Sequence, residues 1–194
     1  MTTTKMGPDS SVVLDACVLA NTALCDLYLR LAETPGLYRP RWSKLILEEV
    51  RRTQTTKLRR PFPPDLAEYW RAEVTAAFPE ALVEDFFHLL PQLTNHEKDR
   101  HVLAAAIAAD ANLIVTFNLR DFPPLSLAPW QMLAWHPQDH LLEMYASNPR
   151  VLWLKLAGIA SSRKEDLQDV LIRLGKSVPA FSQRLLEDCA PRQG

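Results

Sequence analysis

Cysteine is scarce in this chain, and long apolar runs are missing from it. The three cysteines, Cys17, Cys25 and Cys189, are odd in number and show no metal-ligand spacing, which is typical of reduced thiols in a cytoplasm. No apolar run reaches the roughly 18 residues that a membrane-spanning helix needs. The first residues, MTTTKMGPDSS, lack the apolar core of a signal peptide, so we expect a frayed tail there. These absences predict a cytoplasmic protein that does not enter a membrane.

A strong net charge is also missing, since 22 Lys and Arg residues balance 23 Asp and Glu residues. The total gives no indication about nucleic acid, but the local distribution does. Residues 39–60 contain eight basic side chains against only Glu48 and Glu49. Because phosphate contacts supply most sequence-independent affinity, this stretch is a candidate RNA track, with a solvated helix face as the alternative. We expect replacement of Arg51 and Arg52 by Ala to weaken RNA binding and to flatten its salt dependence.

The remaining composition is that of a globular protein. With 194 residues, 47% of them hydrophobic and 23% charged, the chain can bury roughly 70% of its unfolded surface without disulfides. We therefore expect one main domain with room for a small appendage.

The first part of the chain alternates between strand and helix patterns. Residues 11–14 are a short β-branched apolar run that stops at Asp15, which predicts a strand. Leucines and a tyrosine at three- and four-residue steps predict a helix over about residues 19–33. Ser43 is a good N-cap for a second helix that continues to about Thr53. A strand followed by a helix is the opening of an α/β fold.

The middle of the chain continues with helices. The proline-rich segment 61–64 predicts a loop, and helices are expected over about residues 65–77 and 80–90. Residues 94–97, Thr-Asn-His-Glu, have the spacing of a capping box before an Ala-rich helix. Residues 113–115, Leu-Ile-Val, are apolar in succession, as expected of a strand buried on both faces.

The last third of the chain is helical in pattern. Residues 132–135 predict a final strand, and Pro137 suits the first position of a helix. We expect residues 148–194 to form a helical C-terminal extension to a domain that spans residues 11–147. The extension should be broken near residues 148–149, 161–162 and 175–179.

Carboxylates stand where the predicted strands end. Asp15 follows the first strand directly, and Asn118 and Asp121 lie in the polar loop after the strand at 113–115. In open α/β sheets, ligands bind at the carboxyl ends of the strands, so acids from distant parts of the chain are expected to form a site there. Taken singly, each could be an ordinary turn residue.

Four segments together resemble the PIN-domain family, which is best known through the VapC toxins of bacterial toxin–antitoxin pairs. They are VLD at 13–15, ILEEV at 46–50, DRHVLAAAI at 99–107 and IVTFNLRDF at 114–122. The similarity spans about residues 12–137. It implies a three-layer α/β/α sandwich around a mostly parallel sheet, and the helical extension lies outside the common core.

The same resemblance implies divalent-metal-dependent cleavage of RNA, as an endoribonuclease toxin of a type II pair with an antitoxin protein as partner. Cys17 departs from the family pattern, because it replaces the small polar residue often found two places after the first Asp. Carried over residue by residue, the resemblance places Asn118 at a frequent polar position and assigns catalysis and metal binding to Asp15, Glu49, Asp99 and Asp121.

Charge explains why such a site uses a metal. Two carboxylates about 4 Å apart repel by about 4 kcal/mol at an effective dielectric near 20, so a converging group needs a cation or must bind protons. An all-oxygen site suits Mg²⁺ or Mn²⁺. The hypothesis is in-line attack of metal-activated water on a phosphodiester, without a nucleophilic Ser or Cys, and cleavage should stop in excess chelator.

Other interpretations of these residues stay open. Asp99 could only cap a helix or complement its dipole. Of the neighbouring glutamates we favour Glu49, because it borders the apolar stripe of its helix, but Glu48 is the alternative. The alternative function is a catalytically weak module that binds RNA or a partner. A phosphotransferase with Asp15 as nucleophile is disfavoured, because Cys17 stands where an Asp-x-Asp arrangement has its second acid.

The predicted tail carries more large apolar side chains than a small bundle needs, namely Trp153, Leu154, Leu171, Leu174 and Phe181. Together with the resemblance, this predicts self-association and a small antitoxin whose apolar segment occupies a groove on the core. Packing of the tail onto the core is the alternative. The five tryptophans are expected to be core or interface anchors, and the five histidines surface residues or caps.

Overall fold

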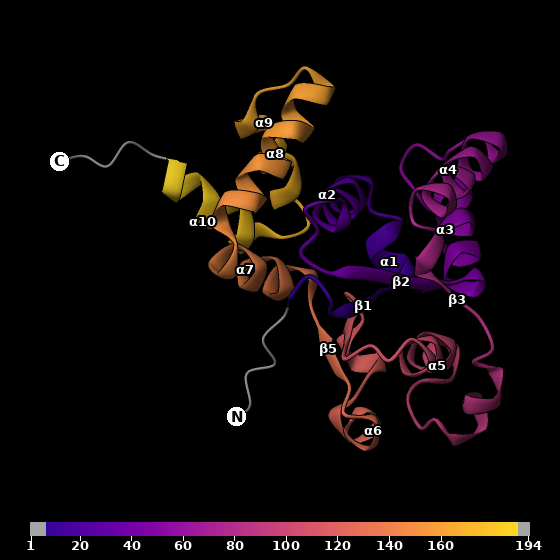
Figure 1. Cartoon of the computed structure of the whole chain (residues 1–194). Coiled ribbons are helices and arrows are strands. Elements are labelled where there is room, and N and C mark those ends of the chain that lie inside the picture. Colours follow the sequence, from indigo (N-terminus) through magenta and orange to yellow (C-terminus); the bar gives the residue numbers. More distant parts are fainter. Residues whose placement is uncertain (1–6, 190–194) are drawn as a thin grey trace.

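The computed structural model describes residues 7–189, and a five-stranded, wholly parallel sheet lies at its centre (Figure 1). The expected frayed tail falls partly on residues 1–6, which lie outside the described residues. Within residues 7–189, no helix is both long and apolar enough to cross a membrane. The strands are β1 (Ser11–Leu14), β2 (Arg39–Ser43), β3 (Leu82–Val83), β4 (Leu113–Val115) and β5 (Leu133–Trp135).

The strand order is β3-β2-β1-β4-β5, so the chain reverses its direction of travel across the sheet on either side of β1. β1 pairs in parallel with both β2 and β4, with Leu14 opposite Val115. The carboxyl ends of β1 and β4 therefore lie side by side at the point where the order reverses. In sheets of this type, that crevice is where ligands bind.

Helices cover both faces of the sheet, which confirms the three-layer α/β/α prediction. One face carries α1 (Ala16–Leu19), α2 (Thr22–Ala32), α3 (Lys44–Thr56) and α4 (Pro64–Ala77), while α5 (Arg100–Ala108) and α6 (Pro124–Leu127) lie on the other (Figure 1). The strands of the sheet's centre are buried on both faces: Val12, Val13 and Ile114 expose none of their surface. This explains why these strands are continuous apolar runs rather than alternating ones.

Local sequence accounts for the helix starts. The Ser43 hydroxyl accepts a hydrogen bond from the backbone N–H of Ile46 at 3.2 Å, so the predicted N-cap of α3 is confirmed. The helix expected over residues 19–33 is interrupted, because Asn21 caps a new start by accepting from the Leu24 N–H at 3.2 Å. The predicted apolar face of α2 is buried as expected.

Two predictions for the middle of the chain are wrong. Residues 80–90 are not a helix: they contain a 3₁₀ turn, the two-residue strand β3 and the start of a second 3₁₀ segment, Phe87–Gln92, with Pro91 inside it. The capping box at 94–97 does not form, because the Thr94 hydroxyl donates instead to Ser126 at 3.0 Å and α5 begins only at Arg100. β2 was not anticipated, since Pro40 interrupts its strand pattern.

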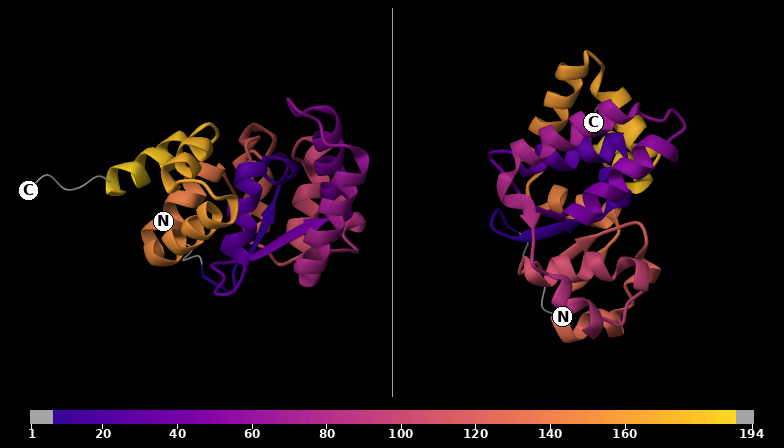
Figure 2. Two further views of the ribbon diagram at one scale, coloured as in Figure 1. Left: turned by 90° about the horizontal axis from the view of Figure 1, so that it is seen from above. Right: turned by 90° about the vertical axis from the view of Figure 1, so that its right-hand side faces the viewer.

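After β5 the chain forms α7 (Pro137–Ser147), with Pro137 at the first position as predicted. The helical tail then consists of α8 (Pro149–Arg163), α9 (Leu167–Gly175) and α10 (Pro179–Cys189). Figure 2 shows α8 and α9 beside α2, at the end of the molecule away from α3 and α4. The ammonium of Lys155, which is 9% exposed, donates to the carbonyl oxygens of Glu33 and Thr34 at 2.9 and 3.5 Å. This places a cation at the C-terminus of α2, where the helix dipole favours one.

The apolar surplus of the tail is used for packing onto the core. Leu171, Leu174 and Phe181 are buried in the same hydrophobic cluster as the sheet, and Trp153 packs against it, whereas Leu154 is 63% exposed. The packing alternative is therefore correct for most of these side chains. The division of the chain at residue 148 stays a prediction.

The prediction for the tryptophans is confirmed, whereas that for the histidines is wrong at one position. Trp42 is fully buried and the other four tryptophans pack against the core, as expected. His136 caps α7 through Nδ1, which the Gln138 N–H contacts at 3.2 Å. His140 contradicts the prediction of a surface residue or cap: it is fully buried between Tyr28 and Tyr38, and burial lowers its pKa to about 3.

The Lys155 contact predicts that the tail stabilises the whole domain. Replacing Lys155 by Met keeps most of the buried stem but leaves the Glu33 carbonyl without its charged donor, so we expect a loss of about 1–3 kcal/mol in the free energy of unfolding. Chemical denaturation measures this loss. Lys176→Ala, at an exposed tail position, is the control and should change stability little. Equal effects of the two variants would contradict a capping role for Lys155.

Candidate metal-binding site

Asp15 is fixed at the end of β1 by its neighbours on β4. Its backbone N–H donates to the Val115 carbonyl at 3.1 Å, and its Oδ2 accepts from the Thr116 hydroxyl at 2.6 Å and the Cys17 thiol at 3.1 Å. Asp15 is the N-cap residue of α1, yet its side chain makes no capping hydrogen bond. In the part of the chain that the structure describes, no hydrogen bond engages Oδ1, which leaves that oxygen for a cation.

Thr116 was not anticipated as part of the site. The signal was present in the sequence, because Thr116 follows the strand at 113–115 just as Asp15 follows the first strand, and parallel register places the two residues side by side. Its hydroxyl also accepts from the Asn118 N–H at 3.0 Å. Thr116 therefore couples the carboxylate of Asp15 to the loop that carries Asn118.

Asp99 precedes α5 as its N-cap residue, but its side chain also makes no capping hydrogen bond. This observation weakens the interpretation of Asp99 as a helix cap. Its carboxylate lies 3.4 Å from Nδ1 of His96, and potential ligand atoms of His96, Asp99 and Asp121 all lie within 4.8 Å of one another. His96 is the second unanticipated residue, since the histidines were expected to show no ligand role.

The loop after β4 holds Asp121 against the segment before α5. The carbonyl of Asp121 accepts from the His96 N–H at 3.2 Å, and its own N–H donates to the Asn118 carbonyl at 2.9 Å. The Arg120 guanidinium lies 3.6 Å from the Asp121 carboxylate but is 88% exposed, so this ion pair is weak.

Glu49, and not Glu48, turns toward these acids. Glu49 is 32% exposed, and its carboxylate lies 3.5 Å from Nε2 of His101 on α5. Glu48 is turned outward and binds Arg51 through two hydrogen bonds of 2.9 and 2.5 Å. Each contact lowers the pKa of the glutamate that it engages, and the His101 hydrogen bond is the largest cause for Glu49.

These side chains line one open pocket of about 580 Å³, which we call the acidic pocket. All four predicted acids are in its wall, together with Cys17 and the polar residue Asn118. Four cations stand around them. The charged lining residues are Asp15, Glu49, Asp99, Asp121, Arg52, Lys57, Lys98 and Arg120.

Repulsion among the carboxylates is visible at Asp99. Partial burial raises the pKa of Asp99, and the negative charges of Asp15, Asp121 and Glu49 raise it further, while His96 acts in the opposite direction. The other three carboxylates are thus close enough to disfavour the charge of Asp99. Oxygen ligands that gain from a nearby positive charge fit a hard divalent cation such as Mg²⁺ or Mn²⁺.

Cys17 stands two places after Asp15, where the family often has a small polar residue, and hydrogen bonds hold it there. Its thiol donates to Asp15 and its sulfur accepts from the Phe117 N–H at 3.3 Å, so it bridges the ends of β1 and β4 as a small polar residue could. Burial and the Asp15 charge raise the pKa of the thiol to about 12. Both effects disfavour the thiolate at neutral pH in the metal-free protein.

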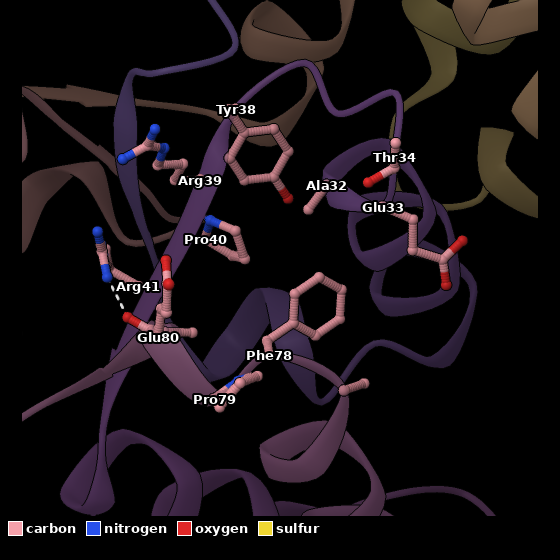
Figure 3. Close-up of a pocket in the computed structure, with 12 residues that line it drawn as sticks. Ala32, Glu33, Thr34, Tyr38, Arg39, Pro40, Arg41, Phe78, Pro79 and Glu80 are labelled. Atoms are coloured by element: carbon pink, nitrogen blue, oxygen red, sulfur yellow. Dashed lines mark hydrogen bonds between the residues drawn. The ribbon is translucent and has the colours of Figure 1, made fainter.

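A second pocket, of about 520 Å³, lies at the amino end of β2, away from the acids (Figure 3). The rings of Tyr38, Pro40 and Phe78 line its middle. Its arginines are engaged within the fold: Arg41 donates to the Glu80 carbonyl, and Arg39 pairs with Asp9 at 2.5 Å, outside the lining. The arginines of this pocket therefore already have partners, whereas the acidic pocket gathers four carboxylates in one wall.

The raised pKa of Asp99 predicts the sign of a mutational effect. A folded-state pKa above the unfolded value means that the charge costs stability above the folded pKa and costs nothing below the unfolded one. In chelator at neutral pH, Asp99→Ala should therefore be as stable as the wild type or more stable. The difference should widen as pH rises from about 4 to about 7. Thermal melts across this range measure it.

Asp139→Ala is the matched control, because Asp139 lies in the first turn of α7 and outside the acidic pocket. There the carboxylate complements the helix dipole, so its loss should cost about 0.3–1 kcal/mol. A melting temperature of Asp99→Ala below that of the wild type, in chelator at pH 7, would assign Asp99 to helix capping.

One known protein resembles the chain over most of its length. A Mycobacterium tuberculosis protein named "Putative ribonuclease VapC50" is 36% identical over 133 residues, which are 65% of this chain and 78% of that protein. No family model matches the chain, and no solved structure matches it. The chain covers more than three quarters of this relative at 36% identity, and its parallel sheet brings the expected acids together at the switch point. The chain therefore belongs to the VapC family of PIN-domain proteins.

Proposed function

We propose that this protein is a divalent-metal-dependent endoribonuclease and the toxin of a type II toxin–antitoxin pair. The observation that carries the proposal is the convergence of four carboxylates in one pocket at the sheet's switch point, where partial burial and the charges of the other three raise the pKa of Asp99. The name of the Mycobacterium tuberculosis relative supports RNA as the substrate. In the proposal, Asp15, Glu49, Asp99 and Asp121 are the catalytic and metal-binding residues.

The residues of the chain hold the site in place before substrate arrives. Thr116 and Cys17 fix Asp15 through Oδ2, and His101 orients Glu49 from α5. Bound Mg²⁺ or Mn²⁺ supplies a more acidic water and positive charge next to the phosphate. Water is the attacking group in this mechanism, and Cys17 holds Asp15 in place instead of attacking the phosphate. Preorganised carboxylates spare the cost of reorganising the site during the reaction.

The proposal predicts cleavage that depends on the metal and on the acids. Purified protein should cut single-stranded RNA with Mg²⁺ or Mn²⁺ and not in excess chelator. Asp15→Ala and Asp121→Ala should each lower the rate by about a thousandfold or more, because several kcal/mol of charge stabilisation are lost. The divalent ion should also raise the melting temperature of the wild type, by mass action on the folded state, and raise that of the variants less.

The neighbouring glutamates provide the matched control. Glu49→Ala should lose activity, whereas Glu48→Ala removes an identical side chain one position earlier, outside the acidic pocket, and should keep it. Cleavage that persists undiminished in excess chelator would refute the mechanism. Equal rates for the two glutamate variants would remove Glu49 from the site.

We also propose an antitoxin protein as partner, on the strength of the family. Because most large apolar side chains of the tail are buried, the tail does not support the prediction of a partner, and the expected groove on the core rests on the family alone. Co-expression with the neighbouring gene should yield a complex in which RNA cleavage is suppressed. A monomer that elutes alone in size-exclusion chromatography, with unchanged activity, would count against the partner.

A further inference from the structure

Two groups of three cations differ in the side chains that surround them. Lys44, Arg51 and Arg71 each contact a glutamate on the outer surface: Lys44 pairs with Glu84 at 2.7 Å, and the arginines pair with glutamates one helical turn earlier. The second group is Arg52, Lys57 and Lys98. These three line the acidic pocket, and with Glu49 they also line an adjoining pocket of about 530 Å³, which we call the basic pocket.

The second group keeps its charge available. Within residues 7–189, no ion pair joins Lys57 or Lys98 to a carboxylate at 4 Å or less. The Arg52 guanidinium lies 3.5 Å from Glu49, farther than Lys44 lies from Glu84 (2.7 Å) or Arg51 from Glu48 (2.5 Å), so this pair is weaker than theirs. Two of the three residues come from α3 and the turn that ends it, and Lys98 comes from the segment before α5. Distant parts of the chain therefore place positive charge on one side of the acids.

Charge balance indicates what these cations bind. The four carboxylates and four cations of the acidic pocket offset one another, so a bound divalent ion would make the pocket positive and favourable to a polyanion. The basic pocket continues from that pocket and already has three cations against one carboxylate. A chain of regularly repeated negative charges matches both pockets at once.

We propose that Arg52, Lys57 and Lys98 hold the phosphates of a single-stranded RNA on one side of the bond that is cut, with the backbone running from the acidic pocket into the basic pocket. This inference rests on the proposed ribonuclease function and deepens it. Within the basic stretch at residues 39–60, the proposal assigns RNA contacts to Arg52 and Lys57 but not to Arg51. Lys98, outside that stretch, takes part as well.

Salt dependence of binding tests the proposal without any turnover. Binding of a fluorescent ten-nucleotide single-stranded RNA is measured by anisotropy in chelator, from about 50 to about 200 mM KCl. Each phosphate contact on a single strand contributes about −0.7 to the slope of log K against log salt concentration. The triple variant Arg52→Ala, Lys57→Ala, Lys98→Ala should therefore have a slope smaller by about 2, so that the wild type loses about 20-fold more affinity over this range.

The matched control is the triple variant Lys44→Ala, Arg51→Ala, Arg71→Ala, which changes the net charge by the same amount at cations that contact outer glutamates. Its slope should equal that of the wild type. Equal slopes for the two triple variants would overturn the proposal, because binding would then follow net charge alone. Melting curves of all three proteins establish that they are folded under these conditions.

Two further measurements, cleavage with Mn²⁺ and binding of polyglutamate, test this inference independently of the proposed function and against an acidic protein as the ligand. If wild-type protein cleaves RNA with Mn²⁺ but the first variant keeps its slope, the ribonuclease stands and the proposed RNA path fails. If the slope falls but no cleavage occurs, the path stands and the enzyme fails. Polyglutamate that binds through the same three residues as tightly as RNA would overturn the proposal and assign the basic pocket to an acidic protein.

Discussion

Parallel pairing of β1 with β4 is the constraint on which the rest of the site depends. It sets Leu14 opposite Val115 and so brings Asp15 beside Thr116, one hundred and one positions later in the chain. The same pairing places the loop with Asp121 next to the segment before α5. Because the sheet order reverses on either side of β1, the chain leaves β1 and β4 in opposite directions, and a crevice for a ligand forms between them.

The grouped carboxylates of the site lower the stability of the folded protein. Partial burial and the neighbouring carboxylates raise the pKa of Asp99, so the charge of Asp99 costs stability at neutral pH. The compensation is distant from the site. A single hydrophobic cluster runs from the central strands to α10, and Lys155 of the tail caps the C-terminus of α2. Stability in the tail thus offsets repulsion at the switch point, which is how proteins commonly keep unfavourable groups that function requires.

The sequence predicted the elements whose signals are local. Strands β1 and β4 are uninterrupted buried runs, and the hydroxyl of Ser43 caps α3 through a contact three residues away. It failed where the deciding contact is distant. β2 contains Pro40, and its place in the sheet depends on pairing with β1. β3 has two residues, too few for a period, so apolar residues 80–90 could be mistaken for a helix.

The site follows the same division between local and distant signals. Asp15 and Asp121 were predicted as site residues because each follows a strand, and the carboxyl ends of parallel strands lie at one edge of the sheet. The phase of α3 favoured Glu49 over Glu48, but only His101 on α5 shows what orients it. The sequence did not show which cations belong to the site. Arg51 and Arg52 are adjacent in sequence, yet Arg51 contacts a glutamate on the outer surface and Arg52 lines the acidic pocket. A charge in a sequence acquires a role only when folding decides which opposite charge lies closest to it.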